Sequence, residues 1–370
     1  MRLLFFAMVL SGCTCATKAA PLPADAGVRY RKVDFHVHAG PGAVPRLVRI
    51  MDERGIDVAV NLSGGWPGAG LPESVEAAEK TKGRIVVFAN PPAQLVMYGL
   101  SPEALAAELE IAHQMGARGV KFFKALGLGY RDSDGNLLAV DDPRLDALFE
   151  KAGELHMPVS IHTGDPIAFW SAPDEKNERF DELNAHPGWS YYGKPVPTWE
   201  ELFAAYERRV ARHPNTTFVG VHFGNAPEMP ERVGAMLDKY PNLYVDTAAR
   251  VPELGRKAAV VREIFLKHPD RILFGTDLGV GEDPDDLMLG STGLLPPSHA
   301  DADRFFSSTW RFFETSDVNF AHPTPIQGRW TISGLGLPRD VLTKLYAGNA
   351  DRLLGLGPAA HARDAGSPAQ

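Results

Sequence analysis

Eight short runs of β-branched or apolar residues, each followed by an amphipathic segment, constrain the fold of this chain more than any other feature. The runs are Val33–His38, Val58–Leu62, Ile85–Ala89, Gly119–Phe123, Val159–His162, Thr217–His222, Leu243–Asp246 and Ile272–Asp277. Strands that alternate with helices form parallel β-α-β units. Eight such units in a chain of 370 residues favour a closed (β/α)₈ barrel over a doubly wound sheet. We therefore predict an α/β fold of the TIM-barrel type.

Helix signals fill the gaps between these runs. Helices are predicted over Ser101–Met115, Pro143–Leu155, Thr198–Arg212, Pro230–Tyr240, Pro252–Lys267 and Pro338–Leu354. Two long inserts interrupt the pattern, Gly164–Pro197 after the fifth strand and Leu278–Leu337 after the eighth. Both follow carboxyl ends of strands, the functional face of such a barrel, so we expect lids or pocket walls. The aromatic residues of the second insert are expected mainly to pack it onto the barrel (Phe305, Phe306, Trp310, Phe312, Phe313).

The N-terminus has the pattern of a targeting segment. Arg2 precedes the apolar stretch Leu3–Leu10, and Leu10-Ser11-Gly12-Cys13 resembles the lipobox of bacterial lipoproteins. That resemblance implies a signal peptide over 1–12, acylation of Cys13 and anchoring in a membrane that faces the periplasm or the cell exterior. Thr14 in the next position favours the outer membrane. A plain secretory peptide cut near Ala16 or Ala20 is the alternative.

The remaining domain plan follows from composition. Residues 13–27 read as a flexible tether, 28–356 as the barrel and 357–370 as a disordered tail. The only two cysteines, Cys13 and Cys15, lie before the barrel, so a metal ion there must be bound by histidines and carboxylates. A net charge of −8 without a basic run argues against nucleic acid as a partner.

The candidate chemistry gathers at strand ends. His36 and His38 lie two residues apart on the first strand and so share one face, which makes them half of a site for a divalent metal ion, Zn²⁺ first among candidates. His162, His222 and Asp277 end the fifth, sixth and eighth strands, and Lys121 lies on the fourth. Side chains at the carboxyl ends of barrel strands converge. Each residue alone has a structural explanation, but their joint placement indicates an active site.

These motifs together resemble the amidohydrolase superfamily, in the branch with amidohydrolase-related hydrolases and aminocarboxymuconate-semialdehyde decarboxylase. The matching segments are Asp34-Phe35-His36-Val37-His38, Ile161-His162-Thr163-Gly164, Val221-His222-Phe223-Gly224, Phe274-Gly275-Thr276-Asp277 and the closing Gly348-Asn349-Ala350-Asp351-Arg352-Leu353-Leu354. The similarity extends from about Val33 to Leu356. It is specific for the superfamily and says little about the substrate.

The resemblance implies one divalent metal ion, with Zn²⁺ the first choice, held by His36, His38, His162 and Asp277. His222 would be an acid/base or electrophilic group. A metal ion with an open position lowers the pKa of a bound water to about 7, and Asp277 can take its proton. The first hypothesis is hydrolysis of an amide, lactone or ester-like bond in a small molecule. The alternatives are a non-oxidative decarboxylase that uses the same site, and a non-catalytic binding lipoprotein.

Lys121 leaves two readings open. In binuclear members of the superfamily a lysine on the fourth strand is carboxylated and bridges two metals, which here would also involve His162 and His222. We favour one metal, with Lys121 and Arg250 contacting an anionic group of a carboxylate-bearing substrate. For Arg250 a salt bridge at the rim is an equal alternative. The sequence does not identify the substrate or the metal ion, and it does not decide whether the protein forms a homo-oligomer.

Overall fold

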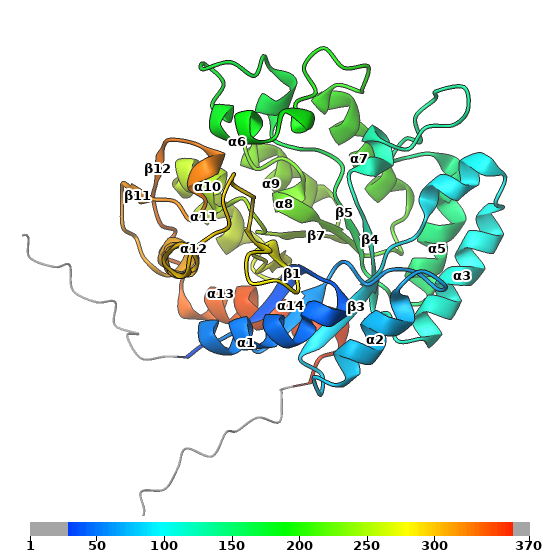
Figure 1. Ribbon diagram of the computed structural model, residues 1–370, viewed down its shortest axis with the longest axis horizontal. Coiled ribbons are helices and arrows are strands. Elements are labelled where there is room, and N and C mark those ends of the chain that lie inside the picture. Colours follow the sequence, from blue (N-terminus) through cyan, green and yellow to red (C-terminus); the bar gives the residue numbers. More distant parts are fainter. Residues whose placement is uncertain (1–28, 358–370) are drawn as a thin grey trace, which may run out of the picture.

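The computed structural model describes residues 29–357, which form one curled parallel sheet with helices on its outer side (Figure 1). The sheet has the order β10-β9-β1-β2-β3-β4-β5-β6-β7-β8. The first eight strands in chain order are β1 Val33–Ala39, β2 Val58–Asn61, β3 Ile85–Ala89, β4 Gly119–Phe122, β5 Val159–Ile161, β6 Phe218–Gly220, β7 Leu243–Asp246 and β8 Ile272–Leu273. The segments predicted to be a signal peptide (1–12) and a tether (13–27), with Cys13, lie outside the described residues, as do residues 358–370 of the predicted tail.

Backbone hydrogen bonds join the two ends of the row of eight strands. The Phe35 N–H donates to the Phe274 carbonyl at 2.8 Å, and the Asp277 N–H donates to the His36 carbonyl at 2.9 Å. Beyond them, β9 (Leu278–Val280) pairs in parallel with β1. The fold is therefore an α/β TIM barrel, as the sequence pattern predicts.

Five strands end earlier than the sequence indicates: β2 and β4 each by one residue, and the three strands that were predicted to end in site residues, β5, β6 and β8. β5 stops at Ile161, one residue before His162, and β6 stops at Gly220, two residues before His222. His222 instead has left-handed backbone angles (φ 54°, ψ 46°). β8 covers only Ile272–Leu273, and Asp277, also left-handed at φ 62°, lies between β8 and β9. The predicted strand ends at His162, His222 and Asp277 are wrong for the same reason: apolar runs do not reveal where a chain turns to present a polar side chain.

Helices cover the outside of the barrel. The longer ones are α1 Val44–Arg54, α2 Leu71–Glu79, α3 Pro102–Gln114, α5 Asp146–Glu154, α7 Trp199–Arg212, α9 Pro230–Lys239 and α11 Ala258–Lys267. Local chemistry sets their starts: the Ser101 side chain accepts the Ala104 N–H, and Thr198 and Glu201 form a capping box. The predicted helix Pro143–Leu155 begins as a 3₁₀ turn (Pro143–Leu145). The predicted helix Pro252–Lys267 is divided into a short α10 (Val251–Leu254), which begins one residue earlier, a 3₁₀ turn and α11.

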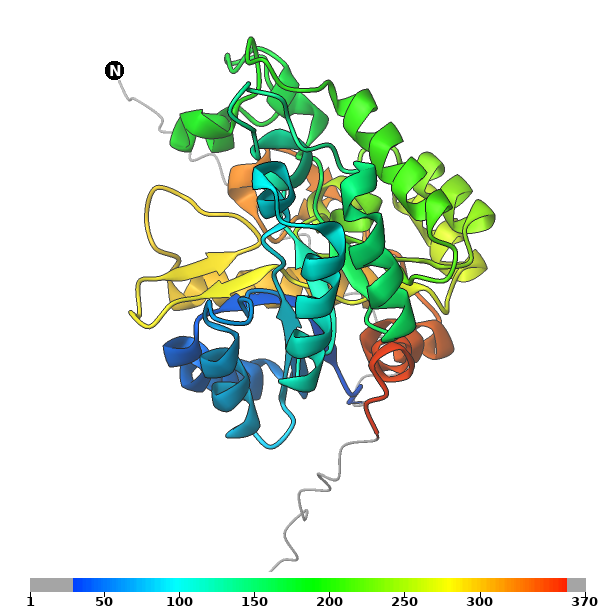
Figure 2. The same ribbon diagram turned by 90° about the vertical axis from the view of Figure 1, so that its right-hand side faces the viewer.

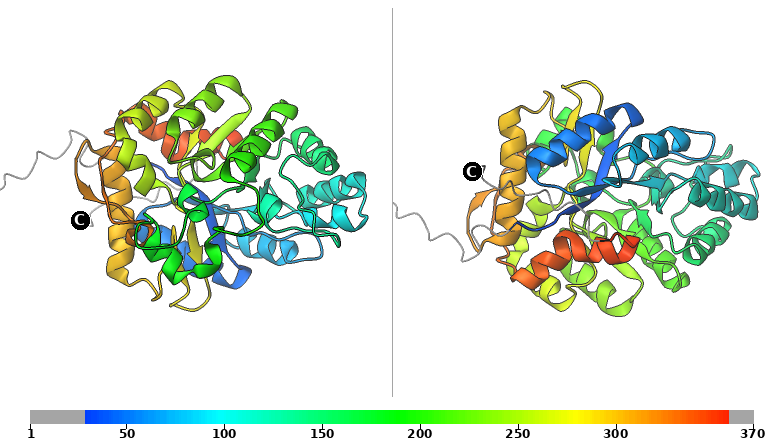
Figure 3. Two further views of the ribbon diagram at one scale, coloured as in Figure 1. Left: turned by 90° about the horizontal axis from the view of Figure 1, so that it is seen from above. Right: turned by 90° about the horizontal axis from the view of Figure 1, so that it is seen from below.

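The amino-terminal end of the barrel is closed by the last helices. α13 (Arg339–Thr343) continues through a π-helical turn into α14 (Asn349–Leu354), seen from below in Figure 3. Ala350 and Leu354 of α14 pack in one buried cluster with Val33, Val60 and Leu273 of the strands. Because apolar side chains fill this end, polar site residues are left to the carboxyl ends.

The segments 164–197 and 278–337 carry structure of their own. The first holds α6 (Phe180–Ala185), and the second holds β10 (Leu287–Leu289), α12 (His299–Glu314), β11 (Phe320–Ala321) and β12 (Thr331–Ile332). The β9–β10 hairpin, yellow in Figure 2, projects from one side of the barrel. The packing expected of the second segment is confirmed: the four α12 phenylalanines are buried, and Trp310 contacts Phe274. No helix within residues 29–357 is both long and apolar enough to cross a membrane.

Candidate metal centre

Three side chains meet at the carboxyl end of β1. His36 Nε2 lies 3.2 Å from His38 Nε2 and 3.4 Å from Asp277 Oδ1, and His38 Nε2 lies 3.3 Å from the same oxygen. The alternation of β1 places both rings on one face, and the Asp277 N–H bond to the His36 carbonyl brings the carboxylate beside them. The structure thus brings together three of the four ligands expected from the sequence.

This triangle has the dimensions of a metal site. Nitrogen and oxygen ligands held about 2.1 Å from a tetrahedral ion lie about 3.4 Å from one another. The three measured separations, 3.2, 3.3 and 3.4 Å, are close to that edge length. Burial acts to raise the pKa of Asp277, but the neighbouring rings of His36 and His38 hold it well below its usual value, so the carboxylate is ionised. The residues therefore fit a divalent cation bound by two histidines and one carboxylate.

A second buried carboxylate anchors the two segments that carry these ligands. Asp34 Oδ2 accepts the Thr276 hydroxyl at 2.6 Å, and Asp34 Oδ1 accepts the Thr276 N–H at 3.0 Å and the His36 N–H at 3.2 Å. Burial raises the pKa of Asp34 to about 7. The network joins β1 to the segment before Asp277 and so fixes the left-handed turn that presents that carboxylate.

His162 and His222 lie beside the triangle. Their ring centroids are 4.4 Å apart, and the His222 ring is 5.0 Å from that of His36. His162 Nε2 faces the Gly164 carbonyl at 3.1 Å, and among residues 29–357 neither group of candidate metal ligands includes His162. Burial lowers the pKa of His162 to about 4 and that of His222 well below its usual value. Both rings are therefore neutral, and the role of His162 as a fourth ligand stays a prediction.

Two cations predicted to bind substrate lie next to these histidines. Lys121 Nζ is 3.4 Å from His36 Nε2, its side chain is 1% exposed, and burial lowers its pKa to about 8. Arg250 is also buried and donates to the Ala249 carbonyl at 3.0 Å. Within the described part of the chain neither cation has a carboxylate partner within 4.0 Å. The rim salt bridge considered for Arg250 is therefore absent there.

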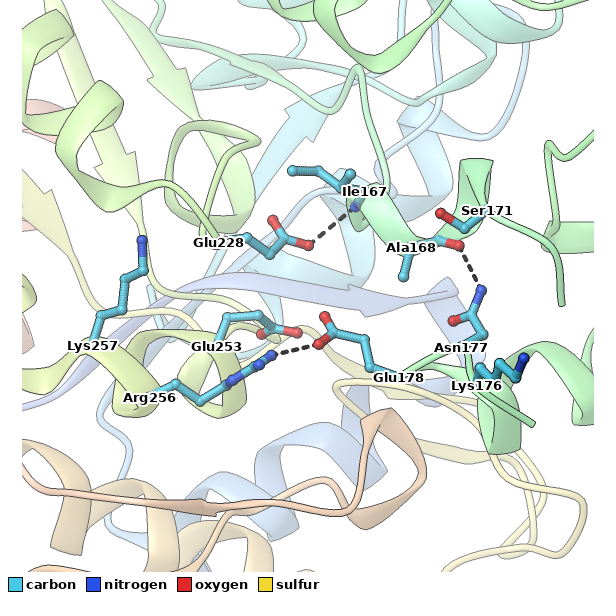
Figure 4. Close-up of a pocket in the computed structure, with 10 residues that line it drawn as sticks. All are labelled: Ile167, Ala168, Ser171, Lys176, Asn177, Glu178, Glu228, Glu253, Arg256 and Lys257. Carbon is cyan, nitrogen blue, oxygen red and sulfur yellow. Dashed lines mark hydrogen bonds and ion pairs between the residues drawn. The ribbon is translucent and has the colours of Figure 1, made fainter. Parts of the chain in front are cut away.

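A cavity of about 690 Å³ opens between the segment after β5 and α10. Its wall is formed by Ile167, Ala168, Ser171, Lys176, Asn177, Glu178, Glu228, Glu253, Arg256 and Lys257. Figure 4 shows the carboxylates of Glu178, Glu228 and Glu253 turned toward a common space. None of the site residues predicted from the sequence lines this cavity. Arg250 connects the two regions electrostatically: its charge acts to lower the pKa of His222, and the charge of Glu228 acts to raise the pKa of Arg250 against the effect of burial.

A family model described as Amidohydrolase matches residues 33–356. The chain belongs to the amidohydrolase family. The match covers the whole barrel, from β1 to the end of α14. A search of curated proteins finds no match.

Solved structures show the same fold at low sequence identity. A presumed amidohydrolase from Staphylococcus aureus is 16% identical, with 88% of this chain and 100% of that chain covered and a TM-score of 0.51. An amidohydrolase II is 14% identical, with 88% and 99% covered and a TM-score of 0.50. A 2,6-dihydroxybenzoate decarboxylase in complex with 2,6-dihydroxybenzoate is 18% identical, with 88% and 100% covered and a TM-score of 0.49. At such identities the likeness to the first two structures describes the barrel alone and leaves the reaction open.

The sequence analysis did not identify two side chains that hydrogen-bond to the predicted metal-binding histidines. Asp246 Oδ2 lies 2.9 Å from His36 Nδ1, and Ser63 Oγ lies 2.7 Å from His38 Nδ1. Asp246 ends a predicted strand, the same position that identifies Asp277 as a site residue, so the sequence pattern could have identified Asp246 as well. Ser63 follows β2 in a loop and gave no signal. Another buried carboxylate, Asp165, pairs with Lys124 at 2.7 Å and lies 3.5 Å from His162 Nε2.

Proposed function

We propose that this amidohydrolase is a metal-dependent hydrolase that cleaves an amide, lactone or ester-like bond in a small, carboxylate-bearing molecule. The observation that supports it is the triangle of His36 Nε2, His38 Nε2 and Asp277 Oδ1, with edges of 3.2 to 3.4 Å. Zn²⁺ is the first candidate because imidazole and carboxylate ligands suit it, although Fe²⁺, Mn²⁺ and Co²⁺ accept the same donors.

When bound, a divalent cation supplies Lewis acidity at the reacting bond and makes water acidic near neutral pH. The chain's own groups then handle protons. Ionised Asp277 is an acceptor for the proton of the attacking water. His222 donates Nδ1–H to the Ala248 carbonyl at 2.9 Å, which leaves a lone pair on Nε2. His222 can therefore take up a proton at Nε2 and pass it to the leaving group, and it stabilises an oxyanion only after this protonation.

Two buried cations support a substrate with a carboxylate. Lys121 and Arg250 have no carboxylate partner within 4.0 Å among residues 29–357, and a buried cation without one attracts an anionic ligand. We propose that they hold the substrate anion beside the metal centre. The part of the substrate remote from the reacting bond would lie in the 690 Å³ cavity, and the segments after β5 and β8 would form the walls or lids of the substrate path.

A carboxy-lyase reaction is the second candidate, and the position of Lys121 favours it. Its ammonium lies 3.4 Å from His36 Nε2, so a carboxylate bound to it lies at the metal centre itself. In a decarboxylase the group that binds there is the one that leaves as CO₂. Release of CO₂ from 2-hydroxybenzoate or muconate-like acids, without hydrolysis of any ester, lactone or N-acyl compound, would establish this reaction instead.

The test of hydrolysis is Asp277→Asn in the zinc-loaded protein, assayed against esters, lactones, N-acyl compounds and aromatic acids. We expect turnover to fall by about 10²- to 10⁴-fold or more, because the variant loses a proton acceptor and a charged ligand. Elemental analysis should find one equivalent of metal in the wild type. The control Asp303→Asn alters an exposed carboxylate on α12 and should leave turnover unchanged. Retained turnover in Asp277→Asn would contradict the role of this residue.

We also propose, from the lipobox-like segment alone, that Cys13 carries acyl chains and tethers the enzyme to a bacterial membrane facing the periplasm or the cell exterior, with the outer membrane favoured. Several chains on one residue hold a protein at a membrane more firmly than a single chain does. The tether of about fifteen residues would then let the barrel stand clear of the lipid surface.

A further inference from the structure

Asp246 lies at the centre of a fully buried hydrogen-bond cluster at the end of β7. Its Oδ2 is 2.9 Å from His36 Nδ1. Its Oδ1 accepts the backbone N–H of His222 at 2.8 Å and that of Ala248 at 3.1 Å. The side chain is 0% exposed. Both oxygens are therefore occupied by partners from three different segments of the chain.

These contacts determine which nitrogen of His36 carries the ring proton. Peptide N–H groups only donate, so Oδ1 acts as an acceptor. Burial raises the pKa of Asp246 to about 7, and the nearby Lys121 acts to lower it. When Asp246 is ionised it also accepts through Oδ2, and its partner there is then Nδ1–H of His36. The Lys121 ammonium, which only donates, faces Nε2 of His36 at 3.4 Å and supports the same assignment. A neutral imidazole with its proton on Nδ1 has its lone pair on Nε2. That Nε2 is the atom 3.2 Å from His38 Nε2 and 3.4 Å from Asp277 Oδ1.

We propose that Asp246 is a positioning residue, which holds His36 with Nε2 free for the metal ion and at the same time fixes the turn that carries His222. This inference rests on the proposed metal centre. Histidine ligands of metals commonly donate their second N–H to a carboxylate or carbonyl, and this outer contact affects metal affinity. His36, His222 and Asp246 also form a second group of possible ligands among the described residues. We assign Asp246 to the support of a ligand because its Oδ2 faces Nδ1 of His36 at 2.9 Å, a hydrogen-bond distance, whereas Nε2 of the same ring faces the triangle.

The same carboxylate explains the unusual backbone of His222. A non-glycine residue at φ 54° is strained and persists only where its surroundings hold it. The Asp246 Oδ1 bond to the His222 N–H is one such restraint, and the His222 Nδ1 bond to the Ala248 carbonyl is a second. The segment Asp246–Ala248 thus sets the ring orientation of both histidines.

Asparagine at position 246 cannot make all of these contacts. It has one acceptor oxygen and one NH₂ donor in place of two acceptors. If its oxygen faces the two N–H groups, its NH₂ faces His36 Nδ1 and forces the ring proton to Nε2. If its oxygen faces His36, its NH₂ opposes the N–H groups of His222 and Ala248. Either orientation damages the site without changing the volume of the side chain.

The experiment measures zinc binding to metal-free protein by competition with a chromophoric chelator. We expect Asp246→Asn to weaken Zn²⁺ binding by about 10- to 100-fold. The control is Glu182→Gln, which makes the same chemical change at a buried carboxylate that pairs with Arg179 at 2.7 Å, outside the metal centre. Its zinc affinity should stay within about threefold of the wild type. If Asp246→Asn binds Zn²⁺ as tightly as the wild type does, the proposal is overturned.

A second measurement needs no substitution at Asp246. Nitrogen-15 spectra of the histidine rings in metal-free wild-type protein, with the His36 signal assigned by its loss in His36→Gln, should show the proton on Nδ1. A proton on Nε2 would overturn the proposal even if Asp246→Asn does not fold. If the wild type binds zinc but turns over none of the tested substrates, the proposed reaction fails and the role of Asp246 stands.

Discussion

Replacing Lys121 by methionine should make the metal-free protein more stable. Lys121 is 1% exposed and has no carboxylate within 4.0 Å in the described chain, and burial lowers its pKa from 10.5 to about 8. At about 1.4 kcal/mol per pKa unit, this shift means that folding with a charged Lys121 costs about 3 kcal/mol. Methionine keeps the length of the side chain and removes the charge. We therefore expect Lys121→Met to raise the free energy of unfolding by about 2–3 kcal/mol at pH 7.

The pH dependence of this gain tests its cause. Below pH 8 Lys121 is protonated in both the folded and the unfolded protein, so the full cost is present. Between pH 8 and 10.5 the unfolded chain binds a proton that the folded chain does not, so the wild type gains stability as the pH rises. Urea unfolding in metal-free buffer should give the variant a higher free energy of unfolding than the wild type at pH 7. At pH 10 the difference between the two free energies should be much smaller.

Lys124→Met is the matched control, three residues further along. Lys124 is 35% exposed and pairs with buried Asp165 at 2.7 Å. Lys124 holds the pKa of Asp165 well below its usual value against the effect of burial, so its removal leaves a buried carboxylate without its cation. Lys124→Met should therefore lower the free energy of unfolding, a change opposite in sign to that expected for Lys121→Met. A loss of stability in Lys121→Met, together with a fall from two bound metal ions to one, would refute the reasoning and favour a carboxylated, bridging Lys121.

Two further predictions address the substrate and the anchor. Arg250→Gln should raise KM for a carboxylate-bearing substrate by about tenfold or more, because it removes the buried cation that would pair with the substrate anion. The control Arg144→Gln, at an exposed arginine, should leave KM unchanged. Steady-state kinetics measures both, and an equal KM in the two variants would exclude Arg250 from the substrate site. Cys13→Ser should abolish labelling by a radioactive fatty acid and move the enzyme from the membrane fraction to the soluble fraction of a bacterial host; unchanged fractionation would exclude Cys13 as the anchor.

The barrel could be predicted closely because its signal is local and repeated. β3 and β7 have the predicted bounds, Ile85–Ala89 and Leu243–Asp246. The alternation of β1 places His36 and His38 on one face, as expected. In each case the pattern of a few neighbouring residues determines the outcome. The arrangement of the second insert could not be read in the same way, because its short strands β11 and β12 pair only with each other.

The parts of the site that sequence reasoning missed depend on contacts across the barrel. Asp246 is 210 residues from His36, and Asp34 is 242 residues from Thr276. A carboxylate at the end of a strand looks the same in sequence whether it binds a metal ion, as proposed for Asp277, or orients a ring, as proposed for Asp246. Only the distances, 3.4 Å to Nε2 of His36 in one case and 2.9 Å to Nδ1 in the other, separate the two roles.

The left-handed turns at His222 and Asp277 link these observations. Neither residue is a glycine, so each turn costs about 1–3 kcal/mol in backbone strain and needs partners that hold it. Asp246 holds the turn at His222 through its N–H, and Asp34 holds the segment before Asp277 through Thr276. Two buried carboxylates thus hold the backbone that presents the two side chains proposed to be catalytic, His222 and Asp277. A stabilised variant that relaxed either turn into an extended strand would carry its side chain away from the other site residues. We expect loss of metal binding when the turn at Asp277 is relaxed, and loss of turnover with metal still bound when the turn at His222 is relaxed.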